Sequence, residues 1–190
     1  GVTEFLSKKA GIKNHEVMLL YNRNLSVSPI TTHIPLKKVS KKININKIVN
    51  NVKIINNFYR KIFKIKPSFG VLGLNPHNYA PSIKSEEKLI IKKAVNKLKK
   101  SRIQVSGPIV PDSSFMIRNR NDFNVIIGMY HDQVLSPFKT LYNFNAINIT
   151  LGLPYIRISP DHGIGENITG KKKANPTSLI ESIKFFNYIK

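Results

Sequence analysis

Three of the five histidines in the sequence follow short apolar runs of the kind that form buried β-strands. His33 comes after VSPITT, His77 after GVLGLNP and His131 after VIIGMY. In an open α/β sheet, ligands bind at the carboxyl ends of the strands. Three neutral imidazoles are a sufficient ligand set for a divalent cation that keeps a position open for water or substrate. A plainer interpretation makes each histidine a hydrogen-bonded residue at a strand end, and the spacing alone leaves both interpretations open.

Polar residues beside and after His131 supply the charges that an anionic substrate needs. Asp132 is placed to orient an imidazole through a hydrogen bond. Arg157, in the apolar stretch PYIRIS, suits two-point contact with a carboxylate or phosphate, and it equally suits a structural ion pair. Lys139, Asn148 and Arg157 are all expected in loops or at strand ends. Because any metal site must combine distant segments, it is expected to form between them, either within one chain or across a subunit boundary.

The elements that must position these residues alternate along the chain. Apolar residues recur at helical spacing from about residue 40 to 65, which predicts an amphipathic helix. The other patterns predict strands at 17–21, 25–33, 71–74 and 124–133, one or two strands within 146–159, and helices at 85–100 and 175–189. Strands that alternate with helices indicate an α/β domain with a largely parallel sheet.

The formal net charge of +21 invites a nucleic-acid interpretation, because a basic surface attracts phosphate backbones. However, the excess is mostly lysine, and it accompanies asparagine and isoleucine throughout the chain. Aromatic residues are not interleaved with the lysines as they are in a groove that binds single strands. Compositional drift is therefore the favoured explanation, and a nucleic-acid partner is not expected.

The absence of cysteine excludes a disulfide scaffold, a thiolate zinc site and a cysteine nucleophile. A glycine-rich phosphate loop and a Gly-x-Ser-x-Gly elbow are missing as well. No apolar run approaches the roughly 20 residues of a membrane span, and the N-terminal sequence lacks the apolar core of a signal peptide. The sequence therefore predicts a cytoplasmic protein with no membrane partner.

Seven motifs together resemble, in order, the C-terminal part of the 4-hydroxythreonine-4-phosphate dehydrogenase family. They are GVTEFLSKK, TTHIPLKKV, VLGLNPH, GPIVPDSSF, GMYHDQ, NITLGLPYIRIS and DHGIGENITGKKKAN. The resemblance covers nearly all 190 residues and identifies the chain as an N-terminally truncated member. It implies a three-layer α/β/α fold like that of the isocitrate and isopropylmalate dehydrogenases, incomplete at the N-terminus. Residues 1–160 would form the metal- and substrate-binding lobe, and residues 161–190 would return to the other, largely missing lobe.

The resemblance also implies a function. Members of this family are homodimers that oxidise 4-phosphooxy-L-threonine with NAD or NADP, and the product loses carbon dioxide to give 3-amino-2-oxopropyl phosphate for pyridoxal phosphate biosynthesis. A divalent metal (zinc, magnesium or cobalt) is shared across the dimer by three histidines. These match His33, His77 and His131, while the substrate contacts match Thr3, Lys139, Asn148 and Arg157. A paralogue acting on phosphorylated threonate or erythronate, and a non-catalytic relative, remain alternatives.

The sequence departs from the family pattern at three places. Val2 stands where the family has a substrate-contacting histidine, and Val134 stands where it has a glycine after MYHDQ. The segment NYAPSIKSEE replaces a glycine-rich acidic loop after His77. Since glycine allows close backbone approach to a ligand, these positions bear directly on the predicted site.

Overall fold

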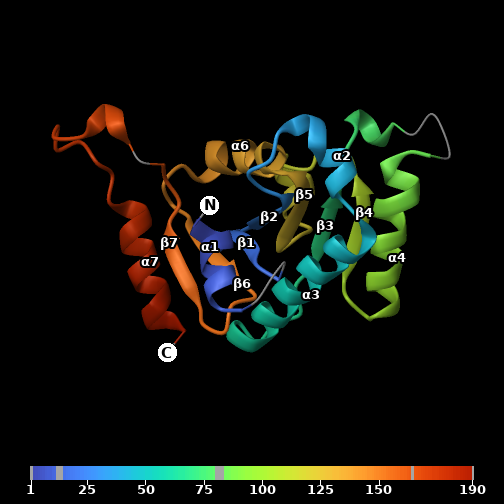
Figure 1. Ribbon diagram of the computed structural model, residues 1–190, viewed down its shortest axis with the longest axis horizontal. Coiled ribbons are helices and arrows are strands. Elements are labelled where there is room, and N and C mark those ends of the chain that lie inside the picture. The colour runs from blue at the N-terminus through green and yellow to red at the C-terminus, as the bar shows by residue number, and fades with distance from the viewer. Residues whose placement is uncertain (1, 12–14, 80–83, 164, 190) are drawn as a thin grey trace.

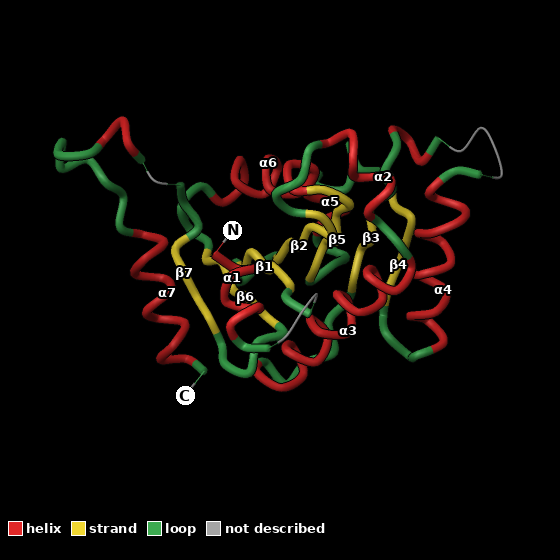
Figure 2. Tube along the Cα trace, in the orientation of Figure 1, coloured by secondary structure: helices red, strands yellow, loops and turns green. Residues whose placement is uncertain are grey.

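The computed structural model describes residues 2–11, 15–79, 84–163 and 165–189. A seven-stranded sheet lies at its centre, in the order β4-β3-β5-β2-β1-β6-β7. Figure 2 shows these strands in the middle of the molecule, with helices around them. The strands are β1 (Val17–Tyr21), β2 (Ser26–Thr31), β3 (Phe69–Leu72), β4 (Val105–Ile109), β5 (Val125–Tyr130), β6 (Ile147–Leu151) and β7 (Arg157–Pro160).

Seven α-helices accompany the sheet in the described part of the chain. They are α1 (Val2–Lys9), α2 (Val39–Lys42), α3 (Ile45–Ile62), α4 (Lys92–Lys100), α5 (Ile117–Arg120), α6 (His131–Tyr142) and α7 (Thr177–Tyr188). Short 3₁₀ turns occur at Leu36–Lys38, Pro76–Asn78 and Glu166–Ile168, and a π-helical turn, Glu87–Ile91, leads into α4. Within the residues described, no helix combines the length and the apolarity that a membrane crossing requires.

The sheet is parallel in one half and antiparallel in the other. Strands β4, β3, β5 and β2 run parallel, whereas β1, β6 and β7 pair antiparallel with their neighbours. The prediction of a largely parallel sheet therefore holds for the half that carries the three histidines. It is wrong for the other half because β1 and β2 form a hairpin, which needs no crossover helix.

Two apolar cores, one on each face of the sheet, confirm the three-layer α/β/α architecture. On one face α3 and α4 cover the larger core with residues such as Ile48, Ile55 and Leu98. On the other face α6 packs over Leu20 and Ile126. Figure 1 shows α4 and α7 at opposite ends of the molecule, where α7 lies beside β7.

The long helix α3 confirms the amphipathic pattern in the sequence. Its N-terminus is fixed by Asn44, whose side chain accepts a hydrogen bond from the Lys47 backbone N–H at 2.9 Å. The buried stripe then follows the 3.6-residue period through Ile48, Val52 and Tyr59. Burial of this stripe fixes the helix across the strands that lead to the histidines.

Several elements differ from the sequence prediction. Strand β3 begins at Phe69, two residues before the predicted start, and β4, α1 and α6 were not predicted. The expectation that Lys139 lies in a loop or at a strand end is wrong, because it belongs to α6. Pro137 inside α6 obscured the helical spacing of the buried residues Val134 and Phe138. In β4 the sequence Gly-Pro similarly weakened the strand pattern.

Candidate functional site

His33 and His131 come together at the carboxyl ends of two neighbouring parallel strands. Thr31, at the end of β2, is the register partner of Tyr130 at the end of β5. The Thr31 hydroxyl also donates a hydrogen bond to the Met129 carbonyl at 2.8 Å, which ties the two strand ends together. As a result the two imidazole rings have centroids 5.8 Å apart, with their planes tilted by 43°.

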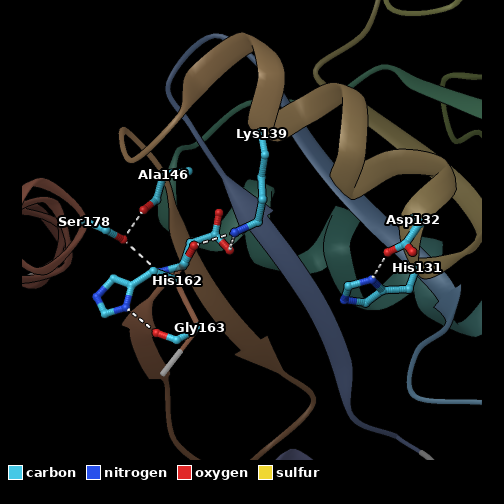
Figure 3. Close-up of polar contacts among 8 residues, drawn as sticks. His131, Asp132, Lys139, Ala146, His162, Gly163 and Ser178 are labelled. Carbon is cyan, nitrogen blue, oxygen red and sulfur yellow. Dashed lines mark hydrogen bonds and ion pairs between the residues drawn. The ribbon is translucent and has the colours of Figure 1, made fainter. Parts of the chain in front are cut away.

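Asp132 contacts the His131 ring directly. Its Oδ1 lies 2.6 Å from His131 Nδ1, and Figure 3 shows the two side chains facing each other at the start of α6. When Nδ1 donates to a carboxylate, the lone pair of Nε2 is left available to a cation. The Asp132 side chain is 79% exposed, so this contact orients the ring more than it stabilises the fold.

His77 lies at the same edge of the sheet but is not gathered with the other two. It follows β3, the other parallel neighbour of β5, and belongs to the turn Pro76–Asn78. Its side chain is 78% exposed, with Nδ1 3.5 Å from Asp112 Oδ2. In the described ranges, no three His, Cys, Asp or Glu side chains are grouped so that they could hold a metal ion. A single chain thus brings two of the three predicted ligands together.

The residues before His77 are held by Glu87, a residue whose role the sequence did not reveal. Glu87 is only 3% exposed. Its Oε1 accepts hydrogen bonds from the Leu74 and Asn75 backbone N–H groups at 3.0 and 2.8 Å. The Asn75 side-chain amide lies 3.1 Å from each carboxylate oxygen. The sequence placed Glu87 only within the helix predicted at 85–100, with no sign of this contact.

Gln133 joins the ends of β5 and β3. Its Oε1 accepts a hydrogen bond from the Met129 backbone at 2.6 Å, and its Nε2 donates to the Gly73 carbonyl at 2.8 Å. The amide therefore links the strand that leads to His131 with the segment that leads to His77. Gln133 belongs to the MYHDQ motif, but its spacing gave no sign of this bridging contact.

Lys139 reaches from α6 to Asp161, which directly follows β7. Lys139 Nζ donates to the Asp161 carbonyl at 2.6 Å and lies 3.2 Å from its Oδ1. Burial raises the pKa of Asp161, and the nearby Lys139 ammonium opposes that rise. The buried Oδ2 of Asp161 has no hydrogen-bond partner among the described residues. The Lys139 ammonium group is therefore already paired with the buried Asp161 carboxyl group before any anion binds to it.

The backbone at Asp161 is fixed by α7. The Asp161 N–H donates to the Ser178 hydroxyl at 2.7 Å, and that hydroxyl donates to the carbonyl of Ala146 just before β6. Figure 3 shows Ser178 approaching from α7 while Lys139 extends from α6. Asp161 and Ser178 were not predicted from the sequence, because their contacts join segments far apart in the chain.

Asn148 and Arg157 lie on the adjacent strands β6 and β7. Arg157 pairs in register with Thr150 and donates from Nη1 to the Thr150 hydroxyl at 2.9 Å. Asn148 lies two residues before Thr150 and therefore shares its face of the sheet. Its buried Oδ1 lacks a hydrogen-bond partner in the part of the chain that the structure describes.

Thr3 and Val134 are the remaining positions that the sequence analysis connects with the site. Thr3 belongs to helix α1, but its side chain lies outside the described residues, as does that of Val2. Val134 lies on the inner face of α6, where it is fully buried and packs closely against Gly128. The valine at this departure from the family pattern is therefore a core residue in this chain.

The chemistry of these residues fits a divalent metal ion. His33 and His131 supply two imidazole rings whose centroids lie 5.8 Å apart, and Asp132 is hydrogen-bonded to the His131 ring. Imidazole is a common ligand of zinc and cobalt, and a carboxylate that fixes the ring orientation is a usual accompaniment. His77, exposed on a separate turn, is not grouped with this pair.

Comparison with known proteins confirms the family resemblance. A sequence model described as "Pyridoxal phosphate biosynthetic protein PdxA" matches residues 1–186. A 4-hydroxythreonine-4-phosphate dehydrogenase of Sulfurihydrogenibium sp. is 45% identical over 187 residues, which are 97% of this chain and 57% of the relative. One from Aquifex aeolicus is 42% identical, with the same shares covered.

A solved structure agrees with these sequence matches. The crystal structure of a 4-hydroxythreonine-4-phosphate dehydrogenase from Klebsiella pneumoniae superposes with a TM-score of 0.83 at 33% identity, covering 99% of this chain and 58% of that one. The chain therefore spans little more than half the length of the relatives that it matches.

Proposed function

Because the chain belongs to the PdxA family, we propose that the protein oxidises 4-phosphooxy-L-threonine with NAD or NADP in pyridoxal phosphate biosynthesis. The oxidised product then loses carbon dioxide to give 3-amino-2-oxopropyl phosphate. The observation that carries the proposal is the approach of His33 to His131 at the carboxyl ends of β2 and β5. A cytoplasmic location is part of this proposal, as expected for an enzyme that makes a small metabolite.

We propose that His33 and His131 bind a divalent metal together with His77 from a second copy of the chain. The separation of His77 from the other two histidines supports a site shared between the subunits of a homodimer. When bound, the metal supplies positive charge that lowers the pKa of the substrate alcohol and stabilises developing negative charge on oxygen. Imidazole ligands favour zinc or cobalt over magnesium.

The chain's own cations and amides would hold the substrate. Lys139 and Arg157 provide positive charge for phosphate or carboxylate, and Arg157 offers a planar fork for two-point contact. Asn148 Oδ1, which has no hydrogen-bond partner among the residues described, is an acceptor for a hydroxyl or ammonium group of the substrate. Thr3 is proposed as a further contact from its match to the family motif. The nicotinamide carries the redox step, and no residue is assigned to its binding.

The proposed division into two lobes has some support from α7. Its inner residues Ser178, Ser182 and Phe185 are buried, yet Leu179, Ile183 and Phe186 on the helix are exposed. We propose that residues 161–190 contact a second lobe, which corresponds to the part of the relatives that this chain does not match.

Metal binding tests the proposal directly. We expect His33→Ala and His131→Ala each to weaken zinc or cobalt binding by more than ~100-fold, since even partners outside the ligand shell are worth 10–100-fold. Isothermal titration of each purified variant measures the effect. His15→Ala is the matched control, because His15 is exposed and precedes β1 instead of following a strand. Parent-like affinity in both ligand variants would refute the assignment.

Substrate assays address the finer part of the proposal. We expect NADH or NADPH to form with 4-phosphooxy-L-threonine when the metal is bound. If phosphorylated threonate or erythronate is oxidised instead, the proposed metal site stands and the proposed substrate is replaced. Intact metal binding without turnover of any of these compounds would favour a non-catalytic relative.

A further inference from the structure

We propose that Glu87 is a positioning residue for His77. It would fix the two residues before the His77 turn, so that the imidazole is presented outward in one place. The inference rests on the proposed function, because it concerns a histidine that is proposed as a metal ligand. Glu87 itself would touch neither metal nor substrate.

The first observation is the way in which the Glu87 carboxylate is satisfied. A buried carboxylate is costly unless donors surround it. Here the donors all come from one short segment, namely the backbone N–H groups of Leu74 and Asn75 and the side-chain amide of Asn75. Hydrogen bonds to an ionised group are stronger than those between neutral groups. The carboxylate therefore holds the chain firmly just two residues before His77.

The second observation is the backbone conformation of the turn. His77 has φ 52° and Asn78 has φ 55°, both in the left-handed region that non-glycine residues avoid. Asparagine tolerates this region, but for His77 the conformation is strained and persists only where the surroundings impose it. On the far side of His77, the Asn78 side chain donates to the Pro108 carbonyl at 3.1 Å. His77 thus lies between two anchored residues, Asn75 and Asn78.

The third observation is the element that carries Glu87. It begins the π-helical turn Glu87–Ile91, which continues into α4. Ile91, Val95 and Leu98 are buried against the sheet, so this support is part of the core. Single π-helical turns within helices occur often at functional sites. The carboxylate consequently links the His77 turn to the rigid layer of α4.

A purely structural role for Glu87 is the alternative, and metal affinity separates the two. If Glu87 only stabilised the fold, its loss would affect every ligand of the metal alike. If it positions His77, its loss matters only while His77 is present. A double-mutant cycle with His77→Ala therefore distinguishes the two roles.

The experiment compares the parent, Glu87→Gln, His77→Ala and the double variant. Zinc affinity is measured by competition with a chromophoric chelator at a fixed chain concentration, and thermal unfolding is recorded for each variant. We expect Glu87→Gln to weaken zinc binding ~10–100-fold, the range found for groups that orient metal ligands. In the His77→Ala background the same change should have no further effect. Glu86→Gln is the matched control, because its contact with Asn75 is longer, at 3.4 Å, and involves neither backbone N–H group.

Asn75→Ala provides a second test should Glu87→Gln fail to fold. It removes the amide contacts with both carboxylate oxygens but leaves both backbone N–H groups in place. We expect a loss of zinc affinity of several-fold, again only when His77 is present.

The outcomes also separate this inference from the proposed function. If His77→Ala weakens zinc binding but neither Glu87→Gln nor Asn75→Ala does, the positioning role is overturned and the metal site stands. An equal loss in the parent and His77→Ala backgrounds also overturns it, since Glu87 would then act through the fold. Parent-like zinc affinity in His77→Ala removes His77 from the metal site and the positioning role with it.

Discussion

Asp161 is the side chain whose environment departs most clearly from that of an ordinary surface carboxyl. It is buried beside Lys139, and one of its oxygens has no partner among the described residues. Its raised pKa means that the folded state holds the proton more tightly than the unfolded state does. This contribution to stability is therefore fully present below the unfolded pKa of about 3.9 and is lost as pH rises through the higher folded pKa.

We therefore expect Asp161→Asn to remove this part of the pH dependence. The Asp161 contribution to the free energy of unfolding should fall as pH rises above about 4, so the parent should lose stability relative to Asp161→Asn over this range. Urea denaturation at a series of pH values measures both slopes. Asp122→Asn, at an exposed position, should keep the parental slope. Identical slopes for the parent and Asp161→Asn would contradict the effect assigned to burial.

At the residue scale, the sequence indicated the pair His33 and His131 because each follows a recognisable strand. It did not reveal Glu87 or Asp161. Glu87 contacts a residue that lies 13 positions away in the sequence, and Asp161 contacts one that lies 22 positions away. No local sequence pattern encodes such contacts. An isolated acid in a polar segment is normally solvated, so its burial became evident only from the packing.

Among the elements, the turn between β6 and β7 leaves no room for a side chain at Gly152. Its φ is +82°, and a Cβ there would lie 1.9 Å from the His15 carbonyl oxygen. Gly152→Ala should therefore lower the free energy of unfolding by about 2 kcal/mol or more, because both the backbone and its neighbour must shift. Urea denaturation measures the change. Gly163→Ala, which has no atom within 4 Å of the added Cβ, should stay within about 0.5 kcal/mol.

The apolar pattern of each helix and strand explains why some elements were predicted from the sequence and others were not. Helix α3 has an uninterrupted apolar stripe, and the β1, β2 and β5 sequences have dense apolar runs. By contrast, α6 begins directly at the end of β5, so the strand pattern of the sequence runs on into the first residues of the helix. Without a loop between two elements, no composition change marks the boundary.

For the whole molecule, the shared metal site predicts complementation between variants. In a mixed dimer of His77→Ala and His33→Ala chains, one of the two sites keeps all three histidines and the other loses two. Random pairing makes about half of the dimers mixed, so about a quarter of all sites should bind zinc tightly. Zinc bound per chain after refolding the two variants together measures this fraction. A mixture that binds no more zinc than the separate variants would exclude a site shared in this way.

The overall architecture was only partly accessible from the sequence. Alternating strands and helices predicted the α/β class and the parallel half of the sheet correctly. The antiparallel half depends on long-range pairing, such as Leu20 with Asn148, which the order of elements does not specify. The predicted division at residue 160 and the dimer stay predictions.

The parallel register between β2 and β5 also restricts how the chain can change in length. One residue inserted between Ser26 and His33 would move that histidine by about 3.3 Å along the strand and turn its neighbours to the opposite face. An insertion between Val125 and His131 would displace His131 in the same way. Substitutions toward lysine, asparagine and isoleucine can therefore accumulate on the surface, but insertions and deletions in these two segments would separate the imidazoles.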